Sequence, residues 1–135
     1  MIESGIISYM AQRTASQENI RPWGRYDIVD AGDGYQVKRI TVESGKRCSY
    51  QSHKKRSEHW VLVSGIAAVT LNDARMQKSK GDILTVPVGS KHRIENIGTK
   101  PVIFIEVQMG EYFGEDDTER YHDDFGRELG DLSKK

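Results

Sequence analysis

From Tyr35 to Met109 the chain is a succession of short runs rich in Val, Ile and Thr, each closed by Gly, Asn, Asp or Pro. The runs are YQVKRITVE, HWVLVSG, IAAVTLN, DILTVP, HRIENI and PVIFIEVQM. β-Branched residues favour strands, and turn residues at this regular spacing are typical of antiparallel sheets, not of alternating strand–helix units. The sequence therefore predicts an all-β sandwich or barrel.

A chain of 135 residues is long enough for one hydrophobic core but not for two. Residues 1–20 carry no motif of catalytic chemistry and predict an N-terminal arm, followed by one domain over residues 21–135. After Met109 the strand pattern stops, and DDTERYHDDFGREL (residues 116–129) predicts a short C-terminal helix begun by an Asp or Thr cap.

Composition excludes several classes of partner. Lys plus Arg and Asp plus Glu number 20 each, so no net field attracts nucleic acid or an acidic membrane surface. No apolar run approaches the roughly 20 residues of a membrane-spanning helix. A single cysteine, Cys48, permits no internal disulfide, and we expect a cytoplasmic protein in which Cys48 is a half-buried packing residue.

The segment QSHKKRSEHW gathers several potential metal ligands. Gln51 and His53 are two apart in a predicted strand and project to the same side. Four residues then separate His53 from Glu58, which is the length of a hairpin loop, so we expect Glu58 to return on the neighbouring strand and face the same interior. His59 should face the opposite way. His92, which follows a strand and a Pro-Gly turn, is the best candidate for a fourth donor.

Two segments resemble the conserved motifs of the cupins. GKRCSYQSHKKRSEHWVLVSG (residues 45–65) and GDILTVPVGSKHRIEN (residues 81–96) have the glycine, ligand and histidine spacings of the first and second motifs of that family. The resemblance implies a double-stranded β-helix, a small jelly-roll barrel, with Gln51, His53, Glu58 and His92 as ligands of a metal inside it. Many cupins carry histidine at the position of Gln51.

Glutamine at this position is shared by the cupin-type (type II) mannose-6-phosphate isomerases. RPWGRY (21–26), EHWVLVSGIA (58–67), IEVQMGEYFGEDDTER (105–120) and DFGR (124–127) are similar to that domain, which is often fused behind a mannose-1-phosphate guanylyltransferase. Cys48, Tyr50 and Thr118 depart from the family pattern, and we expect them to be packing changes.

The resemblance implies an isomerase that interconverts mannose 6-phosphate and fructose 6-phosphate through an enediolate. Other sugar-phosphate or nucleotide-sugar isomerases or epimerases, and a non-catalytic sugar-binding cupin module, are the alternatives. The mixed nitrogen and oxygen donors suit one divalent ion, with Zn, Mn, Fe, Co and Ni all compatible. The catalytic base is not placed by spacing; Lys38, Glu106 and Asp117 are candidates by residue type.

A phosphate group requires cationic donors, preferably the forked guanidinium of arginine. We expect Arg127, in DFGR, and Arg56 and Lys54, in the turn beside the metal ligands, to bind it. Lys54, Lys55 and Arg56 are equally compatible with a turn whose side chains are exposed to solvent and bind no phosphate. We also expect a homodimer, because small barrels of this kind pair through an edge strand.

Overall fold

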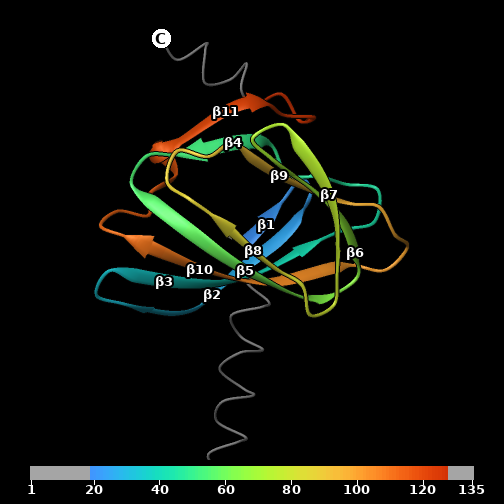
Figure 1. Cartoon of the computed structure of the whole chain (residues 1–135), viewed down its shortest axis with the longest axis horizontal. Helices are drawn as coiled ribbons and strands as arrows, with labels where there is room; N and C mark the ends of the chain where they lie inside the picture. Colours follow the sequence, from blue (N-terminus) through green and yellow to red (C-terminus); the bar gives the residue numbers. More distant parts are fainter. Residues whose placement is uncertain (1–18, 128–135) are drawn as a thin grey trace, which may run out of the picture.

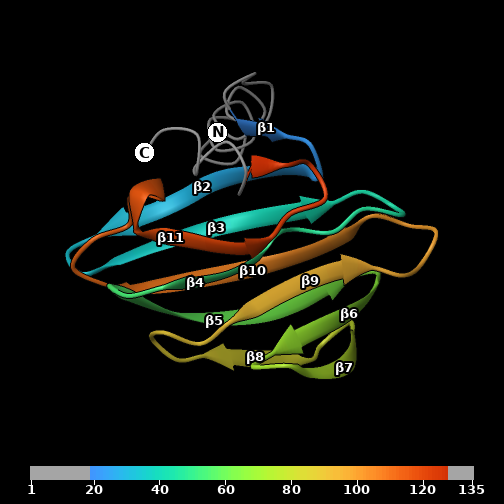
Figure 2. The ribbon, with the colours of Figure 1, turned by 90° about the horizontal axis from the view of Figure 1, so that it is seen from above.

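The structure, a computed structural model, describes residues 19–127, whose strands form two antiparallel sheets facing each other (Figures 1 and 2). The larger sheet has the strand order β1 (Ile20–Arg21), β2 (Gly24–Gly32), β3 (Tyr35–Val42), β10 (Val102–Gly110), β5 (Arg56–Ser64) and β8 (Ile83–Val86). The smaller sheet has the order β11 (Thr118–His122), β4 (Tyr50–His53), β9 (His92–Asn96), β6 (Ile66–Leu71) and β7 (Ala74–Ser79). The predicted all-β jelly roll is confirmed.

Each of the six apolar runs identified in the sequence overlaps a strand: β3, β5, β6, β8, β9 and β10. Strands β1, β2 and β7 lie outside these runs and were not predicted from the sequence. The sequence of β7, ARMQKS, shows little apolar character because this strand is an exposed edge of the smaller sheet. GRYDIVDAG, in β2, mixes charged residues with glycines.

The predicted C-terminal helix is wrong for residues 118–122. Thr118–His122 is strand β11, which pairs antiparallel with β4 after a short 3-10 turn at Glu115–Asp117. The Tyr121 hydroxyl lies 2.8 Å from Ser52 Oγ on β4. Pairing with the free edge of β4 therefore outweighs the weak helical preference of this segment. Residues 128 and 129 lie outside the described residues.

The predicted N-terminal arm lies outside the described residues up to residue 18, and its last residue, Ile20, begins β1. No helix in residues 19–127 has the length and apolar character needed to cross a bilayer.

The interior side chains of β3, β5 and β10 change character along the strands. In what we call the apolar half they are Ile40, Val42, Leu62, Val102 and Phe104. In what we call the polar half they are Lys38, Arg56, Glu58, Glu106 and Gln108, each no more than 8% exposed. Trp60 lies at the boundary, with its ring 4.7 Å from that of Phe104 and its indole nitrogen directed at Glu58.

Both motif segments connect the two sheets, so the prediction of a hairpin with paired strands is wrong. The chain passes from β4 in the smaller sheet to β5 in the larger sheet through residues 54–55, and it returns from β8 to β9 through residues 87–91. The neighbours of β4 are β9 and β11, whereas those of β5 are β10 and β8. The residues before and after each connection consequently face each other across the interior.

Candidate metal centre

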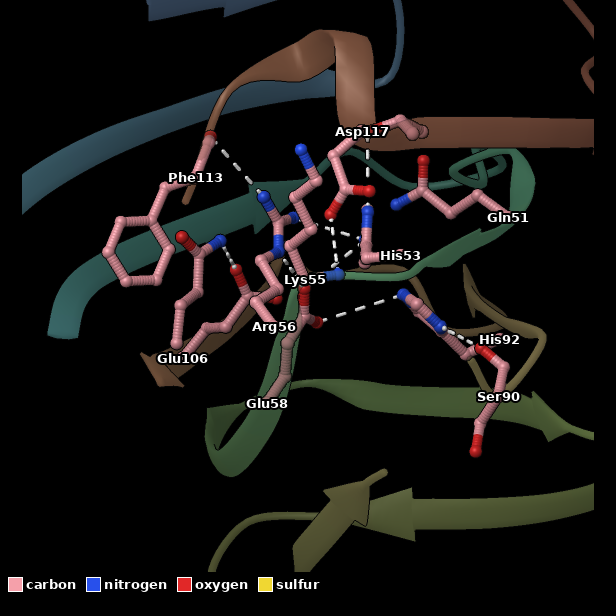
Figure 3. Close-up of polar contacts among 12 residues, drawn as sticks. Gln51, His53, Lys55, Arg56, Glu58, Ser90, His92, Glu106, Phe113 and Asp117 are labelled. Atoms are coloured by element: carbon pink, nitrogen blue, oxygen red, sulfur yellow. Dashed lines mark hydrogen bonds and ion pairs between the residues drawn. The ribbon is translucent and has the colours of Figure 1, made fainter. Parts of the chain in front are cut away.

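Three of the four predicted ligands converge in the interior. His53 Nε2 lies 3.3 Å from Glu58 Oε2, and His92 Nε2 lies 3.7 Å from Glu58 Oε1 (Figure 3). One ligating atom from each residue lies within 4.8 Å of the others, and the three side chains are at most 2% exposed. The two histidines come from the smaller sheet and the glutamate from the larger one.

The hydrogen bond of His92 leaves its Nε2 atom facing Glu58. His92 Nδ1 is 3.0 Å from the carbonyl oxygen of Ser90, which can only accept, so Nδ1 carries a proton and the neutral form of the ring has its lone pair on Nε2. This buried Nε2 atom has no hydrogen-bond partner within the part of the chain that the structure describes. A buried acceptor beside a carboxylate is what a divalent cation requires, so the residues present fit a metal ion.

The pKa values favour the protonation states of metal ligands. Burial would raise the pKa of Glu58. The neighbouring His92, a hydrogen bond donated by Glu106 and the charge of Arg56 outweigh burial and lower this pKa to about 2. Burial, followed by the neighbouring charge of Arg56, lowers the pKa of His53 to about 3. Glu58 is therefore ionised and His53 neutral near pH 7, as metal coordination demands.

Gln51, the fourth predicted ligand, lies on the same strand as His53 and directly opposite His92 in the β4–β9 ladder. It lines the adjoining cavity, and its side-chain oxygen accepts a hydrogen bond from Ser49 Oγ at 3.0 Å. His59 alternates with Glu58 and points away from the cluster, where its Nδ1 lies 3.5 Å from Thr85 Oγ1.

A cavity that opens to solvent adjoins this cluster, and its lining is strongly cationic. Its basic lining residues are Arg21, Lys38, Arg56, Arg93, Arg120 and Arg127. Two predicted phosphate ligands, Arg127 and Arg56, are among them, whereas Lys54 is exposed and does not line the cavity. Sequence reasoning missed Arg21 and Arg120 because their strands, β1 and β11, were not identified.

Arg56 is neither solvated nor part of a turn. It begins β5, is 7% exposed and donates from Nε to Glu58 Oε2 at 2.9 Å. Arg127 forms a fork with Asp123, with N–O distances of 2.7 and 2.9 Å.

Lys38 and Glu106, two of the candidates for the base, are opposite each other in the β3–β10 ladder and both line the cavity. Burial and the neighbouring Glu58 raise the pKa of Glu106 well above its ordinary value, and burial lowers the pKa of Lys38. Asp117, the third candidate, accepts the backbone N–H groups of Lys54 and Lys55 and does not line the cavity. Residue type alone suggested these candidates; the structure shows that Lys38 and Glu106 alternate with the apolar residues of β3 and β10 on the interior face.

The three departures from the family pattern differ in role. Burial raises the pKa of Cys48 to about 12, and this residue packs against the core. The Tyr50 hydroxyl donates to Asp73 at the surface. Thr118 does more than pack, because its Oγ1 lies 3.3 Å from Nδ1 of the candidate ligand His53.

Comparisons with known proteins identify the family of the chain. The family model described as mannose-6-phosphate isomerase C-terminal matches residues 10–123. The chain is 47% identical over 111 residues to mannose-1-phosphate guanylyltransferase ManC of Salmonella typhimurium, covering 82% of this chain and 23% of that protein. It is 49% identical over 110 residues to alginate biosynthesis protein AlgA of Pseudomonas aeruginosa, again covering 82% and 23%. The chain thus spans about a quarter of the length of these relatives.

Solved structures confirm the fold. The capsular polysaccharide assembling protein CapF from Staphylococcus aureus aligns with a TM-score of 0.66 and 23% identity over 77% of this chain and 33% of that one. A protein with a double-stranded β-helix domain from Klebsiella pneumoniae aligns with a TM-score of 0.63 and 24% identity over 72% and 88%. With the family model matching most of its length, the chain belongs to the mannose-6-phosphate isomerase C-terminal family.

Proposed function

We propose that the chain is a metal-dependent aldose–ketose isomerase that interconverts mannose 6-phosphate and fructose 6-phosphate. The observation that carries the proposal is one cavity that reaches His92 and Gln51 of the candidate metal centre, the buried Lys38–Glu106 pair and several arginines. Isomerisation of a sugar phosphate needs these three elements: a cation near the substrate oxygens, a group that moves a proton and a site for the phosphate.

Gln51, His53, Glu58 and His92 would hold one divalent ion, and their nitrogen and oxygen donors are compatible with Zn, Mn, Fe, Co or Ni. When bound, such an ion supplies Lewis-acid stabilisation of negative charge on substrate oxygens. Trp60 Nε1 donates to Glu58 Oε1 at 2.9 Å and orients the carboxylate.

Glu106 and Lys38 are the groups that we assign to proton transfer between C2 and C1 of the sugar. Both are buried, and neither is among the proposed ligands. The pKa of Glu58 is lowered and that of Glu106 is raised, so the two adjacent carboxyl groups occupy different protonation states. Gln108 Nε2 donates to Glu106 Oε2 at 2.6 Å and fixes the orientation of the carboxyl group.

We assign the phosphate to the cationic wall of the cavity, with Arg127 as the predicted contact and Arg21 and Arg120 as additions from the structure. Arg127 is only partly buried, and its fork to Asp123 holds the guanidinium in place.

The test is a coupled assay of mannose 6-phosphate turnover by metal-loaded protein, with unphosphorylated mannose as the comparison substrate. Gln51→Ala should abolish most of the turnover, whereas Gln77→Ala, on the exposed edge strand β7, should leave it unchanged. Binding of mannose 6-phosphate without turnover by the unsubstituted protein would reject the isomerase and favour the sugar-binding module.

The homodimer remains a prediction. The outer face of the larger sheet exposes neighbouring apolar side chains, with Val61 43%, Val63 40% and Ile83 67% exposed, and Val61 is opposite Ile83 in the β5–β8 ladder. Sedimentation of the protein at several concentrations would measure the assembly state.

A further inference from the structure

Arg56 contacts two of the three clustered residues of the candidate metal centre. Its Nε donates to Glu58 Oε2 at 2.9 Å, and its Nη2 lies 3.1 Å from His53 Nε2 (Figure 3). A third contact, from Nη1 to the carbonyl oxygen of Phe113, is longer at 3.5 Å. The guanidinium thus binds two of the proposed metal ligands at once.

The contact with His53 determines where the proton of that ring lies. A guanidinium can only donate, so His53 Nε2 must be the acceptor and Nδ1 must carry the hydrogen, which faces Thr118 Oγ1 at 3.3 Å. An imidazole nitrogen has one lone pair in the plane of the ring. The lone pair that His53 would offer to a metal ion is therefore directed at Arg56.

His92 shows the contrast within the same cluster. Its Nε2 has no hydrogen-bond partner among residues 19–127, and it lies on the other side of the Glu58 carboxylate from Arg56. Arg56 therefore binds His53 Nε2 and Glu58 Oε2. It makes no hydrogen bond with His92 Nε2.

A divalent ion and the guanidinium cannot share these atoms. They would use the same lone pair of His53, and their like charges would repel strongly at short distance in a buried site. Arg56 also lines the cationic cavity, so a guanidinium displaced from His53 has the cavity beside it. An anion bound in the cavity would then attract it.

We propose that Arg56 competes with the metal ion for His53 and Glu58, and that metal binding transfers its guanidinium to the phosphate of the substrate. Metal and sugar phosphate would accordingly bind with positive coupling, each raising the affinity for the other by the same factor. The coupling to sugar phosphate rests on the proposed function, whereas the competition with metal does not.

The first experiment measures the affinity for Co²⁺ or Zn²⁺ by competition with a chromophoric chelator. Arg56→Met should bind the ion about tenfold or more tightly than the unsubstituted protein, because the charged hydrogen bonds of the competitor are removed. Arg47→Met, which removes a partly exposed arginine paired with Asp124, is the matched control and should not change the affinity. Equal or weaker metal binding by folded Arg56→Met, with folding checked by circular dichroism, would overturn the competition.

A second experiment needs no substitution. The structure of the unsubstituted protein determined with bound Co²⁺ should show Arg56 Nη2 beyond hydrogen-bond distance of His53 Nε2. If the ion were bound and this contact stayed near 3.1 Å, the competition would be disproved even if Arg56→Met failed to fold.

The third experiment repeats the metal titration with saturating mannose 6-phosphate. The ligand should tighten metal binding at least about fivefold in the unsubstituted protein and leave it unchanged in Arg56→Met, and uncharged mannose should have no such effect. Equal tightening in both proteins would reject the coupling. Because this readout is affinity, failure of isomerase turnover and failure of the Arg56 inference are separate results.

Discussion

The apolar and polar halves of the barrel interior are built on the same strands but follow opposite rules. Along β10, Val102 and Phe104 are followed on the same face by Glu106 and Gln108, and all four are at most 4% exposed. Burial of the first pair stabilises the fold through the hydrophobic effect. Burial of the second pair costs free energy unless every polar group has a partner.

The comparison shows that hydrogen bonds among its own side chains offset the cost of burying the polar half. Trp60, Arg56, Gln108 and Gln36 each donate to another side chain of this half or its border. A substitution in the polar half should therefore change chemistry more than stability, and a substitution in the apolar half should do the reverse.

The largest effect should come from Glu106→Gln in the polar half. Turnover should fall by at least about 100-fold, because the amide cannot exchange a proton with the sugar. The melting temperature should change little, because glutamine keeps the shape and is uncharged like the protonated carboxyl group that it replaces. Steady-state kinetics and calorimetry measure the two effects, and exposed Glu43→Gln is the control. A Glu106→Gln protein with near-normal turnover would remove this residue from the mechanism.

His92→Ala should weaken metal binding by roughly 100-fold, because it removes a buried nitrogen donor. His59→Ala is the matched control, since this residue precedes Trp60 on β5 but points away from the cluster, and it should bind metal normally. Metal content after dialysis, measured by elemental analysis, distinguishes the two variants. Equal loss in both would mean that the ion is held elsewhere.

Leu62→Ala should act on the apolar half by lowering the free energy of unfolding by about 3 kcal/mol, because a buried leucine leaves a cavity. Val63→Ala, one residue further on the exposed face of β5, should lower it by less than about 1 kcal/mol. Urea titration measures both, and turnover per folded molecule should stay normal. A large loss of turnover in folded Leu62→Ala would break the separation of the two halves.

The smallest effect concerns a buried carboxylate outside the barrel interior. Burial would raise the pKa of Asp27, but hydrogen bonds from Arg25, Arg39 and Asn19 outweigh it and lower this pKa. The ionised form therefore stabilises the fold above pH 3.8, and this contribution is lost as pH falls through the lowered folded-state value.

Asp27→Asn should accordingly lower the unfolding free energy by about 1 kcal/mol at pH 7. The difference from the unsubstituted protein should shrink as the pH is lowered below 3.8, as followed by denaturant titrations at several pH values. A difference that is constant with pH would show that the carboxylate charge contributes nothing.

The sequence was sufficient to predict the strands with strong apolar runs and to select the candidate ligands by their spacing, because both depend on local patterns. It was not sufficient for β11, whose segment forms a strand only because β4 offers a free edge far away in the sequence. The crossing between sheets at residues 54–55 was missed for the same reason, since loop length cannot tell a paired hairpin from a connection between layers.

The neighbourhoods of Lys38 and Arg56 also required the structure. The alternation in β3 places Lys38 inside, but only the register between β3 and β10 brings it opposite Glu106. Arg56 follows two exposed lysines, so its neighbours in sequence suggested a solvent-exposed side chain. It lies on the same face of β5 as Glu58 and Trp60, and this face points into the interior.

The candidate ligands come from both sheets, and this affects how firmly the two sheets are held together. Backbone hydrogen bonds join strands within each sheet, but the layers are held to each other by side-chain packing and by their connecting segments. An ion coordinated by His53, His92 and Glu58 would act as a reversible cross-link between the layers. Its removal would let β4 and β5 separate more easily, so the hydrogen-exchange rates of their amides would report on occupancy of the site.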